Sequence, residues 1–170
     1  MTRDGLVTGG CHHGREAGTF DESARRVSWP ELEMGRLLAS EGHQVRAVAD
    51  GRGRGRIPDF DVCGVATEIK TLRPGATSST VANALRRGRD QGEIVIVNAS
   101  ASGLARHRAD RGVREFVAEQ RLGKISEVRV VGSGFELSYT RADLIRAVQP
   151  RAVQLRQVRP REPPGRALGA

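Results

Sequence analysis

The sequence predicts an α/β fold in which a mixed central β-sheet is flanked by helices. Amphipathic stretches with recognisable caps alternate with short apolar stretches, and this alternation is typical of α/β domains. The continuous apolar run EIVIVNAS, at residues 93–100, indicates a strand that is buried on both faces. A strand of this kind is expected inside a sheet that helices cover.

The first helix is expected over residues 29–40. Ser28 can cap its N-terminus, Pro30 suits its first turn, and Gly42 follows its end. The stretch HQVRAVAD at residues 43–50 alternates between apolar and polar side chains and predicts a strand.

Two strands and a second helix are expected next. PDFDVCG and VATEIKTL predict two strands within residues 58–72, joined near Gly64. The second helix is expected over residues 79–91, with Ser78 or Ser79 as its cap. The remaining expected elements are the buried strand over 93–98, a third helix over 108–123, strands over 126–132 and 134–140, and a last helix over 140–148.

One domain, residues 28–149, is expected between two irregular ends. Residues 1–27 are rich in Gly, Arg and Asp and predict a flexible arm, with a short turn of helix at residues 22–26. Residues 150–170 are rich in Pro and Arg and predict a disordered basic tail. No stretch has the length and apolarity of a membrane span, and the N-terminus has no apolar segment of a secretory signal. We therefore expect a cytoplasmic protein, or a fragment that a longer carrier releases there.

The charge of the chain predicts a polyanionic partner. Its formal net charge is +8, and clustered basic residues gain affinity for nucleic acid by releasing condensed counterions. A coding bias toward arginine would give the same composition. Only two of the 28 basic residues are lysines, Lys70 and Lys124, which draws attention to the first of them. Unlike arginine, lysine carries a compact charge and its pKa shifts readily on burial.

Three ionisable residues around the expected pair of strands form the candidate catalytic group. Glu68 and Lys70 are two positions apart on a strand, so their side chains leave the same face. Asp59 begins the preceding strand, and a tight turn near Gly64 would bring it alongside Glu68. Two adjacent carboxylates are costly unless a cation neutralises them, and their hard oxygen atoms suit Mg²⁺ or Mn²⁺. The alternative is an ion pair on an exposed strand face.

Together with an upstream helix that carries a glutamate, these residues resemble the PD-(D/E)XK nuclease superfamily. Within it, the region from Glu31 to Tyr139 is most similar to the C-terminal tRNA nuclease domain of CdiA, the contact-dependent growth-inhibition toxin. The similarity rests on the segments LLASEGHQV, IPDFDV, TEIKTL, QGEIVIVN and VREFVAEQRLGKISEVRVV.

The resemblance implies a PD-(D/E)XK restriction-endonuclease-like core and a metal-dependent ribonuclease that cleaves tRNA. It implies that Glu31, Asp59, Glu68 and Lys70 are catalytic, and that the three carboxylates hold Mg²⁺ or Mn²⁺. It also implies an immunity protein as a partner that covers the basic cleft. Two alternatives stay open: a DNA endonuclease of the resolvase or restriction type, and a nucleic-acid-binding module with this fold but no activity.

Two residues of the first helix, Glu31 and Glu33, could supply the helix carboxylate of the site. Glu31 falls near Met34 and Leu38 on a helical wheel, on the face expected to turn toward the sheet. Ser28 and Glu31 also have the spacing of a capping box, in which the glutamate only binds the N-cap amide. Glu33 is the alternative, and it could equally lie on a solvated face of the helix. Glu31 is the favoured residue.

Further residues could contact nucleic acid. Trp29 and Tyr139 could stack on bases, although single aromatic residues near the ends of elements more often lie in the core. The sequence CHHG at residues 11–14 could bind zinc, but a chance cluster accounts for it better. The loop GRGRGR could grip phosphates or be only a flexible tip, and arginines at the end of the second helix could form a backbone-binding patch or a solvated face. The candidate nucleic-acid-binding residues are Arg52, Arg54, Arg56, Arg86, Arg87 and Arg89.

Overall fold

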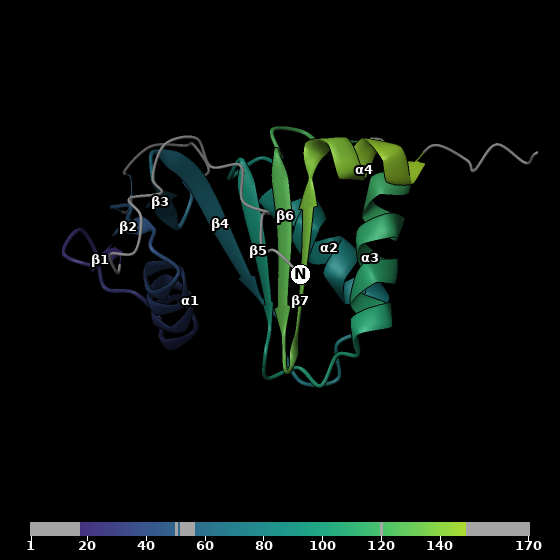
Figure 1. Cartoon of the computed structure of the whole chain (residues 1–170), viewed down its shortest axis with the longest axis horizontal. Helices are drawn as coiled ribbons and strands as arrows, with labels where there is room; N and C mark the ends of the chain where they lie inside the picture. The colour runs from purple at the N-terminus through teal and green to yellow at the C-terminus, as the bar shows by residue number, and fades with distance from the viewer. Residues whose placement is uncertain (1–17, 50, 52–56, 120, 149–170) are drawn as a thin grey trace, which may run out of the picture.

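A seven-stranded β-sheet lies between helices, with α1 on one face and with α2 and α3 on the other (Figure 1). The computed structural model describes residues 18–49, 51, 57–119 and 121–148. The elements are β1 (Thr19–Asp21), α1 (Trp29–Ser40), β2 (Gln44–Ala47), β3 (Phe60–Val62), β4 (Val65–Thr71), α2 (Ser78–Gly88), β5 (Ile94–Ala99), α3 (Arg106–Ala118), β6 (Glu127–Gly132), β7 (Phe135–Thr140) and α4 (Arg141–Val148).

The sheet is mixed, as the sequence predicts. Its strands follow chain order, with β4, β5 and β6 parallel to one another and with β3 and β7 antiparallel to their neighbours. Every residue of β5 is buried, because helices cover both of its faces. The predicted fold class, a mixed central sheet flanked by helices, is confirmed.

The N-terminal region departs from the flexible arm predicted for residues 1–27. Thr19–Asp21 form β1, which pairs in parallel with β2 at the edge of the sheet. Residues 22–26 contain a turn instead of the expected turn of helix. A three-residue strand is too short for side-chain alternation to reveal it, so the sequence pattern carried no sign of β1. Residues 1–17 and the predicted tail at 150–170 lie outside the described part of the chain.

The helix boundaries test the predicted caps. α1 spans the expected residues, but Thr77 caps α2, and its backbone N–H donates to Thr80 Oγ1 at 3.1 Å. α3 begins at Arg106, two residues before the expected start at 108. The sequence did not indicate this start, because the N-cap residue is Ala105 and alanine gives no capping signal. Among the described residues no helix has the length and apolarity needed to cross a membrane.

The two faces of the sheet carry separate apolar cores, and this decides where the polar residues of β4 point. Ile69 belongs to the core beneath α1, whereas Val95 and Val97 of β5 belong to the core beneath α2 and α3. In the parallel register Glu68 pairs with Val95 and Lys70 with Val97. Paired residues share a face of the sheet, so Glu68 and Lys70 point toward the α2 side.

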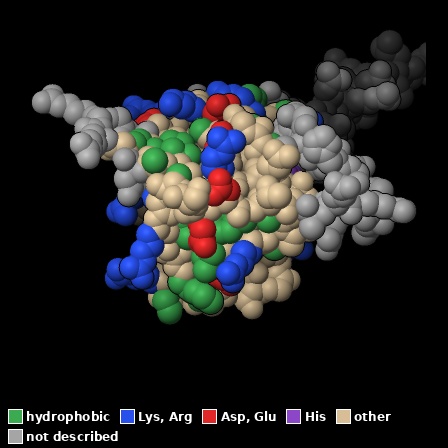
Figure 2. All heavy atoms as spheres, turned by 90° about the vertical axis from the view of Figure 1, so that its left-hand side faces the viewer, with side chains coloured by type: hydrophobic (Ala, Val, Ile, Leu, Met, Phe, Trp, Pro, Cys, Tyr) green, Lys and Arg blue, Asp and Glu red, His purple; other side chains and the backbone are tan. Residues whose placement is uncertain are grey.

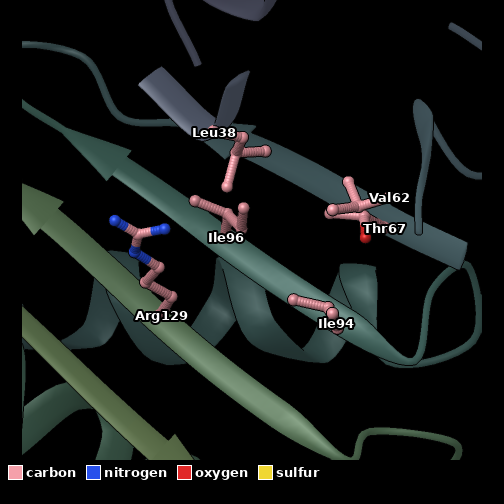
Figure 3. Close-up of a pocket in the computed structure, with 6 residues that line it drawn as sticks. All are labelled: Leu38, Val62, Thr67, Ile94, Ile96 and Arg129. Atoms are coloured by element: carbon pink, nitrogen blue, oxygen red, sulfur yellow. The ribbon is translucent and has the colours of Figure 1, made fainter. Parts of the chain in front are cut away.

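A buried arginine fastens the far end of α1 to the sheet. Arg129 of β6 has only 2% of its side chain exposed and lies on the α1 face beside Leu38 and Ile96 (Figure 3). Its Nη1 donates to Oε2 of Glu41, the C-cap residue of α1, at 2.6 Å, and its Nε donates to Oε1 of Glu136 at 2.6 Å. The C-terminus of α1 is thereby tied to β6, the strand next to the β7 edge of the sheet.

Candidate active site

The hairpin of β3 and β4 brings two predicted site residues together. Its turn is formed by Cys63 and Gly64, whose φ angles of 54° and 84° are both left-handed and allow a tight reversal. Asp59 comes directly before β3, and its Oδ2 accepts a hydrogen bond of 2.8 Å from the backbone N–H of Ile69. The carboxylate of Asp59 is therefore held against β4, next to Glu68.

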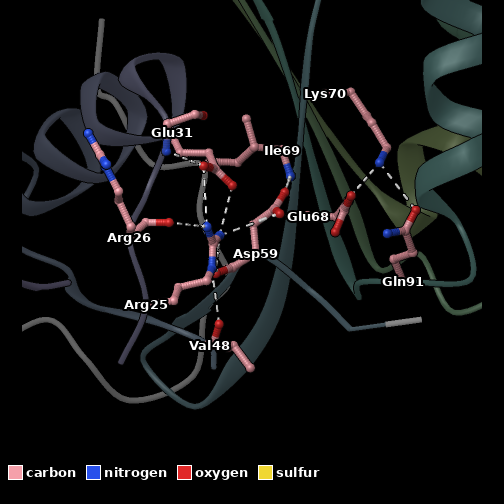
Figure 4. Close-up of polar contacts among 10 residues, drawn as sticks. Arg25, Arg26, Glu31, Val48, Asp59, Glu68, Ile69, Lys70 and Gln91 are labelled. Atoms are coloured by element: carbon pink, nitrogen blue, oxygen red, sulfur yellow. Dashed lines mark hydrogen bonds and ion pairs between the residues drawn. The ribbon is translucent and has the colours of Figure 1, made fainter. Parts of the chain in front are cut away.

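Glu68 is a buried carboxylate with one oxygen in a polar contact and one without. The residue is 2% exposed, and its Oε1 forms an ion pair with Nζ of Lys70. Nζ also donates to Oε1 of Gln91 at 3.2 Å, so the ammonium lies between two acceptors (Figure 4). Glu68 Oε2 is buried and has no hydrogen-bond partner among the described residues. Burial raises the pKa of Glu68 against the opposing effect of Lys70.

Glu31 reaches the same region from the first turn of α1, and Arg25 links it to Asp59. Arg25 Nη2 donates to Glu31 Oε1 at 2.7 Å and lies 3.6 Å from Asp59 Oδ1. The same guanidinium donates to the backbone oxygens of Val48 at 3.0 Å and Asp59 at 3.2 Å, so it also binds the ends of β2 and β3 (Figure 4). Sequence analysis missed Arg25, because it falls in the stretch predicted to be a flexible arm.

The capping role of Glu31 is present alongside this contact. Its Oε2 accepts a hydrogen bond of 2.6 Å from the backbone N–H of Ser28, which closes the capping box. Burial would raise the pKa of Glu31, but the hydrogen bonds from Arg25 and Ser28 outweigh burial and lower it to about 2. Glu33, the alternative helix carboxylate, is exposed to solvent on α1. The structure therefore places Glu31, and not Glu33, beside Asp59.

The pKa of Asp59 responds to the other carboxylates. Burial raises the pKa to about 6, the hydrogen bond from Ile69 opposes that rise, and the charges of Glu68 and Glu31 add to it. A raised pKa caused by burial and by like charges marks three acidic groups that share one small region. Groups perturbed in this way are common at functional sites.

The donor set suits a hard divalent cation, but it is not assembled around a single point. All the candidate ligand atoms are carboxylate oxygens, and Glu68 Oε2, without a partner among the described residues, is a buried acceptor of the kind that a cation satisfies. Within the described ranges no group of three or more His, Cys, Asp or Glu side chains is arranged to hold a metal ion. The guanidinium of Arg25 lies between Glu31 and Asp59 and occupies the place where a cation shared by these two carboxylates would bind.

The candidate nucleic-acid-binding arginines are only partly described. Residues 52–56 and the CHHG segment lie outside the described part of the chain. Arg86 donates through Nε to Oε1 of Glu119 at 2.9 Å, which neutralises much of its charge. Arg87 is exposed at the end of α2, and Arg89 lies 3.8 Å from Asp90. Among these three, Arg87 is best placed to meet a phosphate.

Comparison with known proteins finds a family model that is similar to part of the chain. Residues 56–137 match the family model of the contact-dependent growth inhibition CdiA C-terminal domain. The segment that matches the CdiA C-terminal domain contains Asp59, Glu68, Lys70 and Gln91, whereas Glu31 precedes it. The hairpin and the Lys70 contacts thus lie in the part of the chain that resembles the CdiA C-terminal domain.

A solved structure shares the fold. A chain of the CdiA-CT/CdiI toxin and immunity complex from Burkholderia pseudomallei superposes with a TM-score of 0.50 at 14% sequence identity. The match covers 71% of this chain and 98% of that chain. A search of curated proteins finds no match. The mixed α/β architecture is therefore shared with a chain of a CdiA toxin–immunity complex.

Replacing Glu31 with glutamine tests whether this residue does more than cap α1. Glutamine keeps the capping hydrogen bond but loses the charge that pairs with Arg25, so we expect a stability loss of about 1–2 kcal/mol. The nuclease activity that the sequence resemblance implies, assayed well below the melting temperature, should fall by about 10-fold or more, because an amide binds a hard cation poorly. Glu33→Gln is the matched control and should change neither quantity. Wild-type activity in Glu31→Gln would restrict Glu31 to a structural role.

The raised pKa of Asp59 predicts a pH dependence of stability in the presence of EDTA. Its folded-state pKa of about 6 lies above the ordinary 3.8, so the stability that protonation supplies is complete below 3.8 and is lost as the pH rises through 6. An asparagine side chain cannot ionise, so Asp59→Asn should gain stability relative to the wild type as the pH increases from about 4 to 7. Melting temperatures measured across this range should show a widening gap, and a constant gap would contradict the raised pKa.

Proposed function

We propose that this chain is a toxic effector that acts as a metal-dependent ribonuclease, with tRNA as its substrate. The observation that carries the proposal is the pair of carboxylates at the β3–β4 hairpin, Asp59 and Glu68, with Lys70 beside them. Glu68 Oε2 is buried and has no partner within the described part of the chain. The resemblance to the CdiA C-terminal domain supports the toxic role. The order of Asp59, Glu68 and Lys70 along the hairpin supports membership of the PD-(D/E)XK superfamily.

Asp59 and Glu68 would hold Mg²⁺ or Mn²⁺, and Glu31 would join them after exchanging its contact with Arg25. A divalent ion held by these groups lowers the pKa of a bound water molecule and stabilises charge on a phosphoryl oxygen. The Ile69 backbone N–H fixes Asp59 Oδ2, whereas Oδ1 faces Arg25 and would turn to the cation once that contact is exchanged. Lys70 is held by Glu68 and Gln91, where its ammonium can bind a phosphate oxygen or orient a water molecule.

The choice of RNA, and of tRNA within it, rests on the family resemblance together with charge. The net charge of +8 favours a polyanionic substrate, because each phosphate contact releases counterions. Charge alone does not separate RNA from DNA. The resemblance to a tRNA nuclease domain supports RNA, and a comparison of the two substrates decides between them.

An immunity protein is the partner that this function calls for. A toxic nuclease needs a protein that blocks it in the cell that makes it, and the chain superposed from Burkholderia pseudomallei comes from a toxin–immunity complex. The surface around the β3–β4 hairpin is where such a protein would block substrate. Acidic groups on that protein would complement the basic residues of this chain.

The test is cleavage of defined nucleic acids by the full chain. Total RNA and supercoiled plasmid DNA are incubated separately with the protein in Mg²⁺ or in EDTA, and products are resolved on gels. We expect tRNA to be cut in Mg²⁺ and to stay intact in EDTA, with Glu33→Gln as active as the wild type. Full activity in EDTA would exclude the metal dependence. Cutting of plasmid alone would point to a DNA endonuclease. Nucleic-acid binding that is equal in Mg²⁺ and in EDTA, without any cutting, would point to an inactive binding module.

A further inference from the structure

Trp29 is a large apolar side chain that the fold leaves in solvent. It is the only tryptophan in the chain, it is the first residue of α1, and it is 73% exposed. The apolar stripe of α1 uses Met34 and Leu38 to pack on the sheet, and Trp29 takes no part in that core. An indole normally contributes more buried area than almost any other side chain, so leaving it exposed forgoes stabilisation that packing would supply.

The two aromatic residues that sequence analysis treats alike have different environments. Tyr139 is half-buried against the core beneath α2 and α3, and its hydroxyl donates to Oδ1 of Asp110 at 2.5 Å. Its ring and its polar atom are therefore both engaged within the fold. Trp29 has its ring available, and of these two residues it is the one that can stack on a ligand.

Trp29 lies directly beside the candidate active site along the chain. Ser28, its neighbour, donates its backbone N–H to Glu31, and Glu31 is two positions after Trp29. Residues two apart on a helix do not face each other, so Trp29 and Glu31 lie on different faces of the first turn of α1. A substrate whose phosphate lay at the carboxylates would place a neighbouring nucleotide, and not the scissile bond, over Trp29.

Side chains of both charges lie near Trp29: Arg26 is three positions before it, and Glu33 is four positions after it, one helical turn away. Arg26 is exposed, and its side chain extends away from the carboxylate cluster beside α1 (Figure 4). On the face of the molecule at the β1 and α1 end, basic side chains lie at the margin and also near the centre, where acidic side chains lie among them (Figure 2). A nucleic-acid strand could bind Arg26 through a phosphate and present a base to the indole.

We propose that Trp29 is a stacking platform for an unpaired nucleobase that flanks the phosphodiester at the active site. The choice of ligand rests on the proposed function. A planar indole beside a phosphate-processing site matches the common way in which proteins bind single strands, through aromatic stacking combined with basic contacts. The base must be unpaired, because a base inside a duplex has both faces covered by its neighbours. Trp29 would thus direct the enzyme to loops or ends of RNA.

Because Trp29 is the only tryptophan, its fluorescence reports this contact directly. The full chain is titrated in EDTA, which prevents metal-dependent cleavage, with a short single-stranded RNA and with the same RNA in a duplex. We expect the single strand to quench the fluorescence and the duplex to quench it far less. By fluorescence anisotropy of labelled RNA, Trp29→Ala should bind about 10-fold or more weakly, since base stacking on an aromatic residue is typically worth that much.

Two variants separate stacking from apolar contact and from loss of fold. Trp29→Phe keeps an aromatic face and should retain much of the affinity, whereas Trp29→Leu should bind as weakly as Trp29→Ala. Ile145, the other large exposed apolar residue among those described, lies on α4, and Ile145→Ala is the matched control that should bind like the wild type. All variants should melt at the wild-type temperature, because the side chains removed are exposed.

The outcomes of this experiment are independent of cleavage. Quenching by single-stranded RNA without cleavage in any metal would support the stacking platform and reject the proposed nuclease. Two results together would reject the platform and leave the proposed nuclease in place. They are cleavage of RNA by Trp29→Ala with an unchanged KM, and no quenching of the wild-type tryptophan fluorescence by single-stranded RNA. Quenching by a protein partner but not by RNA would also reject it, and would assign Trp29 to a protein interface.

Discussion

Replacing Glu68 with glutamine should lower the rate of RNA cleavage by about 100-fold or more. Glu68 Oε2 is the buried acceptor that has no partner among the described residues, and an amide at this position supplies one oxygen in place of a carboxylate. The charge that would attract a divalent ion is lost, and so is the negative partner of Lys70. The measurement is the initial rate of tRNA cleavage at saturating Mg²⁺.

The stability of Glu68→Gln should rise or stay unchanged while its cleavage rate falls. This combination separates a defect in the site from a defect in folding. Burial raises the pKa of Glu68, so its ionised form is destabilised in the fold. A neutral glutamine avoids part of that cost, and Glu68→Gln should melt at or above the wild-type temperature in EDTA. A variant that is both stable and active would show that Glu68 is a structural residue. Residues that sacrifice stability for function commonly behave in the predicted way.

The sequence predicted the local part of the site because local patterns determine it. Glu68 and Lys70 share a strand face through their two-residue spacing, and Asp59 reaches them through one hairpin turn. Such relations need only strand periodicity and a turn signal such as Gly64, both of which are visible in the sequence.

The rest of the site depends on contacts between residues far apart in the chain. Arg25 meets Asp59 across 34 positions, and Lys70 meets Gln91 across 21. No periodicity encodes which arginine of an arginine-rich chain will fold back onto a carboxylate. β1 is what carries Arg25 to the site, and a three-residue strand leaves no pattern. The burial of Arg129 in EVRVV was equally invisible, because its partners lie on other elements.

Breaking the two ion pairs of Arg129 should have the largest effect on stability of the changes considered. Replacing both Glu41 and Glu136 with glutamine should destabilise the protein by about 3 kcal/mol or more, because the guanidinium of Arg129 would stay buried without the two carboxylates that pair with it. Burial disfavours the charge of Arg129, but its hydrogen bonds to the two glutamates outweigh burial and hold its pKa above the usual arginine value. Urea unfolding at neutral pH measures the loss.

Removing the arginine of this ion-pair network and removing its two glutamates should cost different amounts of stability. Arg129 is 2% exposed, whereas Glu41 and Glu136 are 30% and 45% exposed and can be hydrated when they are left alone. Arg129→Met should therefore cost less than the double glutamate change, since methionine fits the apolar surroundings provided by Leu38 and Ile96 (Figure 3). Adding Arg129→Met to the double variant should recover most of the lost stability.

Arg146→Gln is the matched control, because it breaks the ion pair with Asp143 through a side chain that is 71% exposed. That change should cost no more than about 0.5 kcal/mol. The network also bears on function, since Glu41 ends the same helix whose first turn carries Glu31. If Arg129 serves to hold α1 in place, the double glutamate variant should lose activity at temperatures where it is still folded, and Arg129→Met should restore it. Equal destabilisation by Arg146→Gln and by the double variant would mean that burial does not govern the strength of these ion pairs.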